Sequence, residues 1–142
     1  MKMENWAREF LLKSRLAHLA TSTRRGEPHV IPICYAYDGA SIYSSIDEKP
    51  KRANPNRLRR ILNIVENPHV SMVVDQYEED WSELRYVLVR GSAGIVRAGE
   101  ENNEAVSLLR EKYRQYRSMK LEGRPIIKIE PVSIIAWSAS GT

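Results

Sequence analysis

The stretch HVIPICYAYDGASIYSSI, residues 29–46, decides the fold. Its first half, 29–37, is rich in β-branched and aromatic residues, which favour a β-strand. Pro32 lies inside this run and cannot donate to a ladder, so the strand is expected at a sheet edge or at a bulge. Asp38-Gly39 is typical of a hairpin turn, and the residues that follow it, ASIYSSI, form the returning strand. The stretch therefore predicts an antiparallel hairpin.

The remainder of the chain predicts further strands joined by turns. Alternating or β-branched runs predict strands over 16–22, 69–77, 85–97 and 125–137. Gly91, Gly94 and Pro131 fall inside the last two runs, where each predicts a bend or a bulge. Hairpin connections, in place of alternating helices, favour an antiparallel sheet that is closed or partly closed. The sequence thus predicts about six strands in one such sheet.

Two or three helices accompany the strands. Trp6 and Phe10, one turn apart, predict a short helix over 4–14. A second helix is expected after Asn54 and Pro55, a cap and a first-turn proline, with one apolar stripe of Leu58, Ile61, Leu62 and Val65. A third helix is expected over 101–117, with a buried face of Ala105, Leu108, Leu109, Tyr113 and Tyr116. The predicted fold class is therefore mainly β (α+β).

Length and composition fit one domain over residues 1–142. Basic side chains number 22 and acidic ones 18, for a net charge of +4, which is ordinary for a globular chain. No apolar run approaches the roughly 20 residues of a membrane helix, and the charged N-terminal segment lacks the apolar stretch of a signal peptide. The single cysteine, Cys34, excludes an internal disulfide framework. We therefore expect a cytoplasmic protein without a membrane partner.

The residues identify no catalytic group, so the catalytic residues stay unassigned. His18, His29 and His69 are far apart in the sequence and have none of the spacings of metal ligands, so no metal is expected. Cys34 lies in the apolar run PICYA, which favours an inert core thiol over a nucleophile. The chain has no GxSxG, GxGxxG or Walker-type phosphate loop. His18, within LAHLA, is more typical of a core or interface residue than of a proton donor.

The most informative chemical feature is SSIDEKPKR, residues 44–52, which runs into a basic block at residues 49–60. The strand end offers two hydroxyls and the loop after it offers three cations: Ser44, Ser45, Lys49, Lys51 and Arg52. Converging hydroxyl and ammonium donors are what a phosphate or polyol group requires. A solvated basic loop is an equally good interpretation of these residues alone. Nucleic acid is not expected, because no aromatic residue lies among the charges of this block.

A series of short motifs runs along residues 14–137: RLAHLAT, GEPHVIPI, YDG, IYSS, KPK, RILNI, NPHV, DQYEEDW and VRGSA. Their order resembles the pyridoxamine-phosphate-oxidase-like split β-barrel superfamily of flavin and deazaflavin oxidoreductases. The stretch DQYEEDW, residues 75–81, looks like a subgroup of probable deazaflavin-dependent enzymes that use coenzyme F-420. The resemblance implies an antiparallel six-stranded split β-barrel of Greek-key type. It also implies a homodimer with one cofactor in each of two grooves between the subunits.

The resemblance also assigns cofactor-binding residues. It places backbone beside the tricyclic ring along the strand that holds Pro32, Ile33 and Cys34. It assigns the ribityl chain and the phosphate to the strand end and the basic loop, with two further arginines nearby: Ser44, Ser45, Lys49, Lys51, Arg52 and Arg57. Many members carry arginine where Lys49 stands, and lysine keeps the charge but loses the bidentate geometry.

Two classes of function stay open at this point. The first is an oxidoreductase that transfers a hydride between coenzyme F-420 and a small organic substrate, with FMN as the alternative cofactor. Because the cofactor supplies such chemistry, this class needs no triad, metal or reactive cysteine. The second is a non-catalytic flavin- or tetrapyrrole-binding module. Coenzyme F-420 is favoured over FMN because the basic block carries more charge than one phosphate needs, and F-420 has a longer anionic tail.

Overall fold

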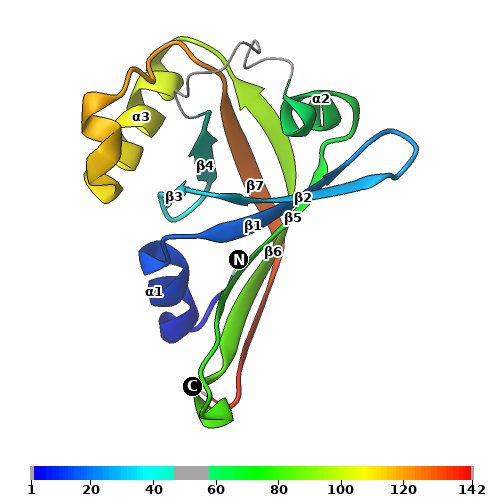
Figure 1. Cartoon of the computed structure of the whole chain (residues 1–142), viewed down its shortest axis with the longest axis vertical. Coiled ribbons are helices and arrows are strands. Elements are labelled where there is room, and N and C mark those ends of the chain that lie inside the picture. Colours follow the sequence, from blue (N-terminus) through cyan, green and yellow to red (C-terminus); the bar gives the residue numbers. More distant parts are fainter. Residues whose placement is uncertain (1, 47–57, 142) are drawn as a thin grey trace.

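A computed structural model of the chain describes residues 2–46 and 58–141 (Figure 1). In this part of the chain, seven strands form one sheet in which every pairing is antiparallel. The strands are β1 (Ala17–Ser22), β2 (Pro28–Ile33), β3 (Ala36–Tyr37), β4 (Ile42–Ser45), β5 (His69–Gln76), β6 (Arg85–Val96) and β7 (Ile126–Ser138). The helices are α1 (Asn5–Lys13), α2 (Arg59–Glu66) and α3 (Glu100–Lys112), with 3-10 helices η2 (Trp81–Glu83) and η3 (Arg114–Ser118). The predicted fold class, mainly β with flanking helices, is confirmed.

The sheet must curl because its two edge strands are neighbours in the chain. The strand order is β2-β1-β5-β6-β7-β4-β3, so β2 and β3 lie at opposite edges. Only Cys34 and Tyr35 separate these strands, and a link of this length spans at most about 11 Å. The two edges therefore meet, and the sheet curls into a barrel that is split between β2 and β3. We call this junction the seam.

The predicted strand over 29–37 is thus two strands, which makes seven in place of the predicted six. The ladder is interrupted at Tyr35, whose backbone N–H donates to the Tyr113 hydroxyl, 3.1 Å away, rather than to a neighbouring strand. Pro32 lies in the edge strand β2, which is hydrogen-bonded to a neighbouring strand on one side only. An edge strand tolerates the missing N–H of a proline. The Asp38 carboxylate closes the next turn by accepting from two backbone N–H groups at 2.8 and 2.6 Å.

A bulge in the pairing of β6 and β7 lies at Gly91. The register shifts just before this residue, which pairs with Pro131 and leaves Val132 unpaired. A Cβ at Gly91 would lie 2.6 Å from the carbonyl O of Glu130, so only glycine fits without a shift of the backbone. Gly91 and Pro131 therefore lie at the predicted bulge, whereas Gly94 lies in regular pairing.

Buried apolar side chains form two clusters. The main core lies between α1, α2 and the inner face of the sheet, and its most buried members include Leu11, Leu19, Tyr35, Ile42, Met72, Val74, Ile127 and Ile129. The second cluster joins α3 and η3 to β3, β4 and the start of β7, and consists of Ala36, Tyr43, Ala105, Val106, Leu109, Tyr116, Leu121 and Ile126. Figure 1 shows α3 beside β3 and β4, apart from α2.

The buried face of α2 differs from the predicted stripe. Val65 is 65% exposed, and Ile64 and Asn63 are buried. Asn63 can be buried because its amide donates to Thr21 Oγ1 at 3.0 Å, which satisfies part of its hydrogen-bonding capacity. The predicted cap and first-turn proline lie outside the described residues.

The predicted third helix ends early, at Lys112. Beyond it the chain forms η3, where the Tyr116 N–H donates to the Tyr113 carbonyl at 3.1 Å. Tyr116 is still buried, as its place on the predicted face requires. No helix among the described residues is long and apolar enough to cross a membrane.

Candidate functional site

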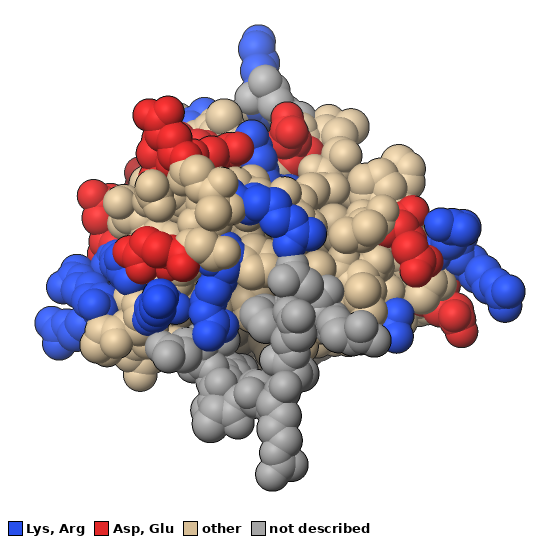
Figure 2. Space-filling model, turned by 90° about the horizontal axis from the view of Figure 1, so that it is seen from above, with Lys and Arg blue, Asp and Glu red and all other residues tan. Residues whose placement is uncertain are grey.

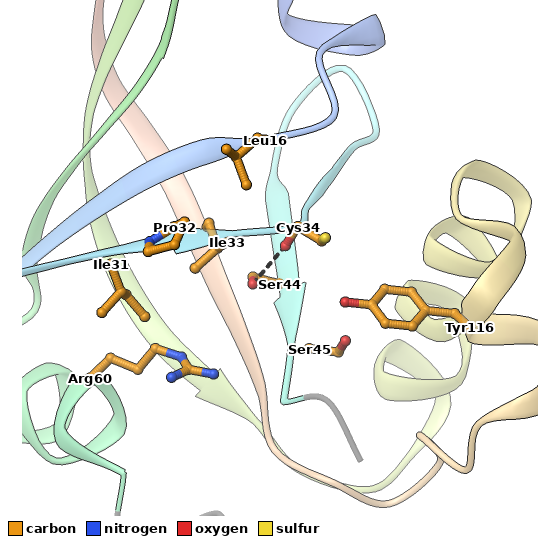
Figure 3. A pocket seen from close by; sticks show the side chains of 9 residues that line it. All are labelled: Leu16, Ile31, Pro32, Ile33, Cys34, Ser44, Ser45, Arg60 and Tyr116. Atoms are coloured by element: carbon orange, nitrogen blue, oxygen red, sulfur yellow. Dashed lines mark hydrogen bonds between the residues drawn. The ribbon is translucent and has the colours of Figure 1, made fainter. Parts of the chain in front are cut away.

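A hollow of about 340 Å³ opens at the seam of the barrel. Its walls are Leu16, Ile31, Pro32, Ile33, Cys34, Ser44, Ser45, Arg60 and Tyr116. The edge strand β2 and the end of β4 form its floor, because the curled sheet brings these strands together (Figure 3). Arg60 reaches in from α2, and Tyr116 reaches in from η3 on the opposite side (Figure 3).

The hollow lies between the two hydrophobic clusters. Ile33 belongs to the main core and Ile31 packs against it. On the other side, Tyr116 belongs to the second cluster and Cys34 packs against that cluster. The shape of the hollow therefore depends on how the second cluster sits against the barrel.

The two serines at the end of β4 differ in their hydrogen bonds. Ser44 Oγ donates to the carbonyl O of Cys34 at 2.8 Å and so links β4 to the seam. Ser45 is 5% exposed, and among the described residues its Oγ has no hydrogen-bond partner. A buried hydroxyl without a partner is costly, and Figure 3 shows this oxygen directed to the space in front of Tyr116. Ser45 therefore indicates a ligand with a hydrogen-bonding group.

Tyr116 is held in place by Arg110 on α3. The Arg110 Nε donates to the carbonyl O of Tyr116 at 3.0 Å, and one terminal nitrogen donates to that of Met119 at 2.7 Å. The same guanidinium forms a two-pronged ion pair with the Glu122 carboxylate, and this pairing lowers the pKa of Glu122 to about 2. Arg110 thus fixes the segment that carries one wall of the hollow.

A lysine and two tyrosines support the seam from behind. The Tyr35 hydroxyl donates to the carbonyl O of Leu11, and the Tyr113 hydroxyl lies 3.1 Å from the Tyr35 carbonyl O. Lys112 Nζ lies 3.8 Å from the centre of the Tyr35 ring. Burial, and then the charge of Arg15, lowers the pKa of Lys112 to about 8. Burial likewise raises the pKa of Tyr113 to about 12.

Five of the predicted cofactor-binding residues line this one hollow: Pro32, Ile33, Cys34, Ser44 and Ser45. The other four, Lys49, Lys51, Arg52 and Arg57, lie outside the described residues. Cofactor binding by these nine residues stays a prediction. The prediction did not include Arg60 and Tyr116, which come to the hollow from distant segments. Arg60 ends the basic block noted in the sequence, whereas no local pattern marks Tyr116.

His18 was predicted to be a core or interface residue, and it is not a core residue, whereas its place at an interface stays a prediction. His18 is exposed on β1, because it points to the outer face of the sheet while its neighbours Ala17 and Leu19 point inward. It is not among the residues that line the hollow. In the described ranges, no group of three or more His, Cys, Asp and Glu side chains is arranged to hold a metal ion.

The fold and the hollow define a class of protein, the split β-barrel with a hollow at its seam. A family model described as pyridoxamine 5'-phosphate oxidase matches residues 3–138, and the chain belongs to this family. The predicted family resemblance and the split-barrel fold are therefore confirmed.

Solved structures agree in fold. A conserved hypothetical protein of Mycobacterium tuberculosis, Rv2991, has a TM-score of 0.79 and 21% identity over 98% of this chain and 86% of its own. HutZ, the heme storage protein of Vibrio cholerae, has a TM-score of 0.72 and 17% identity over 97% and 95%. An F420 reductase has a TM-score of 0.67 and 23% identity over 94% and 98%. No curated protein matches the sequence.

Proposed function

We propose that the chain is an oxidoreductase that binds coenzyme F-420 at the seam and transfers a hydride between it and a small organic substrate. The observation that carries this proposal is Ser45, a buried hydroxyl without a described partner that faces a hollow containing Arg60. None of the described residues that line the hollow is an acid, so the polar part of the hollow suits an anionic group. The fold similarity to an F420 reductase is compatible with this choice.

The chain's own residues bind and orient the cofactor. The backbone of Pro32, Ile33 and Cys34 would hold the ring, and Ser44 and Ser45 would hold the ribityl chain. Arg60 would hold the phosphate and the anionic tail, together with four cations outside the described residues: Lys49, Lys51, Arg52 and Arg57. Bound coenzyme F-420 supplies the hydride chemistry. Leu16 and Ile31 exclude water from the ring side of the hollow.

On the face that Figure 2 presents, the charged side chains of the described residues do not form one continuous basic surface. Figure 2 shows Lys and Arg side chains interspersed with Asp and Glu on the face that it presents. This pattern favours a discrete anionic ligand over a nucleic acid, which contacts many phosphates at once.

The second part of the proposal is a C2 homodimer that completes each cofactor groove. Apolar side chains on the outer face of the sheet support it, with Val30 60% exposed and Ile135 and Trp137 each 44% exposed. Such an exposed set is typical of an interaction surface. We expect the dimer to bury more than about 2,000 Å². Light scattering at low micromolar concentration should give a dimer, and a stable monomer would contradict the shared groove.

Parallel titrations test the choice of cofactor. The apo protein is titrated with coenzyme F-420 and with FMN at about 0.15 M salt, with tryptophan fluorescence and absorbance as readouts. We expect F-420 to bind at least about tenfold more tightly, and the reduced coenzyme to pass its hydride to an acceptor. Equal or tighter FMN binding would make FMN the cofactor. Binding of either, or of a tetrapyrrole, without turnover of any acceptor would favour the non-catalytic module.

Substitutions test the anion site. Lys49→Ala or Lys51→Ala should weaken F-420 binding by about 10- to 100-fold, because each removes a charge-assisted contact. Arg60→Gln should also weaken binding, whereas Arg59→Gln should not. Arg59 is the matched control because it is exposed, adjacent on α2 and not a lining residue. Unchanged affinity in all four variants would show that the basic block serves another ligand.

A further inference from the structure

Cys34 is a free thiol that the fold holds at the wall of the hollow. It is partly exposed and unpaired, and it lines the hollow. Its carbonyl accepts from Ser44 Oγ at 2.8 Å, and the next residue, Tyr35, is anchored to Leu11 and Tyr113. A movement of the link between β2 and β3 that withdrew the sulfur from the hollow would have to break these hydrogen bonds.

A buried amine lies behind this thiol. Lys112 Nζ is buried and, among the described residues, donates no hydrogen bond. Its contacts are the faces of Tyr35 at 3.8 Å and Tyr113 at 5.4 Å. Burial and the charge of Arg15 lower the pKa of Lys112, whereas the charge of a Cys34 thiolate would raise it. Cys34 and Lys112 therefore lie close enough to interact electrostatically. Because its pKa is about 8, the amine is mostly charged at neutral pH, and a cation behind the sulfur stabilises the negative charge that thiol–disulfide exchange places there.

The hollow itself is built for a ligand. Ser45, which is 5% exposed, directs an unpartnered Oγ into the same space. A volume of about 340 Å³ can hold the thiol-linked part of a small molecule. Since Cys34 is the only cysteine of the chain, an oxidised Cys34 cannot pair within its own chain. A thiol of another molecule is then its disulfide partner.

We propose that Cys34 is a reversible modification site at which a low-molecular-weight disulfide thiolates the protein and closes the hollow to its cofactor. In this step the Cys34 thiolate attacks one sulfur of the small disulfide, whose S–S bond breaks as a new S–S bond forms to Cys34. The other half leaves as a thiolate and takes a proton from water. The small disulfide is the oxidant, and excess free thiol reverses the exchange by the same route.

The modification and the cofactor then exclude one another, a consequence that rests on the proposed function. A thiolated Cys34 occupies the space beside Ile33 and Ser44 that the ring requires. Thermodynamic linkage makes the effect mutual, because a ligand that occupies the hollow protects the thiol as much as the adduct weakens the ligand. Cofactor binding would therefore depend on the balance of thiol and disulfide in the surroundings.

The experiment uses glutathione disulfide and the full chain, with intact mass as the first readout. We expect one adduct per chain at neutral pH, reversed by dithiothreitol, and none on Cys34→Ser. Reaction should be faster on the folded protein than on the urea-unfolded chain. Lys112→Met should slow it several-fold, while Lys13→Met, which removes an exposed charge from α1, should not. A folded protein that reacts more slowly than the unfolded chain would overturn the proposal.

The second readout is ligand affinity, measured with FMN and with coenzyme F-420. Thiolation should weaken the binding of whichever cofactor binds by more than about tenfold, and saturating cofactor should slow thiolation by a similar factor. The affinity of Cys34→Ser, whatever its value, should not respond to glutathione disulfide. Unchanged affinity of the thiolated protein would overturn the closure of the hollow. Failure of both cofactors to bind the reduced protein would instead overturn the proposed function, while the mass and rate readouts would still decide whether Cys34 is the modification site.

Discussion

The main core and the second cluster are both buried, but they are held together in different ways. The main core is almost wholly apolar, and its strands are tied by long ladders between β1, β5, β6 and β7. The second cluster is smaller and is fastened by polar contacts at its margins. The difference teaches that the stability of the barrel and the shape of the hollow are controlled by separate sets of interactions.

The polar fastenings of the second cluster require defined geometry. The Tyr43 hydroxyl donates to Glu101 Oε2 at 2.8 Å, and Lys128 Nζ pairs with the same oxygen at 2.7 Å. The fully buried Asn102 donates to the Arg124 carbonyl O at 2.8 Å. Hydrogen bonds to charged groups contribute to stability but depend on alignment and on pH. A change of pH that weakens these contacts should therefore loosen the second cluster while the barrel stays folded.

The same substitution in both regions should show the largest contrast. Leu19→Ala in the main core should lower the free energy of unfolding by about 2–5 kcal/mol, measured by urea denaturation. Leu109→Ala removes an equally buried side chain from the second cluster. We expect it to release hydrogen-exchange protection in α3 and η3 while β1, β5 and β6 stay protected. Equal loss of protection across the whole chain would show that the two regions form one cooperative unit.

Gly91→Val should have a smaller effect on the free energy of unfolding. It tests whether the β6–β7 pairing can shift at the bulge. The new Cβ would meet the Glu130 carbonyl O at 2.6 Å, so the β6–β7 ladder must shift. Overpacking of this kind costs about 1–3 kcal/mol, which is measurable as a lower urea midpoint. Gly94→Val is the matched control, because it lies on the same strand with no atom within 4 Å of its Cβ position. Equal midpoints for the two variants would contradict a sterically locked bulge.

Arg110→Lys should separate the shape of the hollow from the stability of the barrel. A lysine cannot reproduce the contacts to Tyr116, Met119 and Glu122 together. We expect cofactor affinity to fall several-fold and exchange protection of 113–122 to drop, while the urea midpoint moves less than in Leu19→Ala. Arg114→Lys, at an exposed position of η3, should change neither quantity. A large shift of the midpoint without loss of affinity would assign Arg110 to stability alone.

The smallest expected effect is a pH dependence at Lys112. The pKa of this amine is lowered to about 8 in the folded protein, so at higher pH the unfolded chain binds a proton that the folded chain has released. Stability should therefore rise from pH 8 to about pH 10, by a fraction of about 1.4 kcal/mol per pH unit because the Lys112 residue as a whole is only partly buried. Lys112→Met should remove this rise. The window ends near pH 10, because the raised pKa values of Tyr35, Tyr43 and Tyr113 act in the opposite direction above it.

Local patterns predicted most of the strands and helices but not the seam. The run 29–37 is uniformly β-favouring, and nothing within it marks Tyr35 as the residue that leaves the ladder. That residue is held by the hydroxyl of Tyr113, which is 78 positions away. The extent of α3 was overestimated for a related reason: Tyr113 and Tyr116 are three residues apart, a spacing that suits both an α-helix and a 3-10 helix.

The site was predictable to the extent that its residues are near one another in the sequence. Ser44 and Ser45 end a strand that the hairpin predicts, and the family resemblance pointed to Pro32, Ile33 and Cys34. Arg60 and Tyr116 complete the hollow only through the curl of the sheet and the packing of the second cluster. The buried place of Asn63 on α2 has the same origin, because its partner Thr21 lies on β1. Such long-range contacts leave no periodic pattern in the sequence.

The bulge opposite Gly91 also has a consequence for mutational tolerance. Because Val132 is the extra residue, the residues of β7 that face the main core have odd numbers before the bulge and even numbers after it. Before the bulge the inward residues are Ile127 and Ile129, and after it they are Ile134 and Ala136. A substitution scan for folding would find Glu130 tolerant before the bulge, and tolerant odd positions, including Ile135 and Trp137, after it. Ile126 would not be tolerant, because it is buried in the second cluster. Without the structure, such a scan would suggest two short strands where the chain forms a single one.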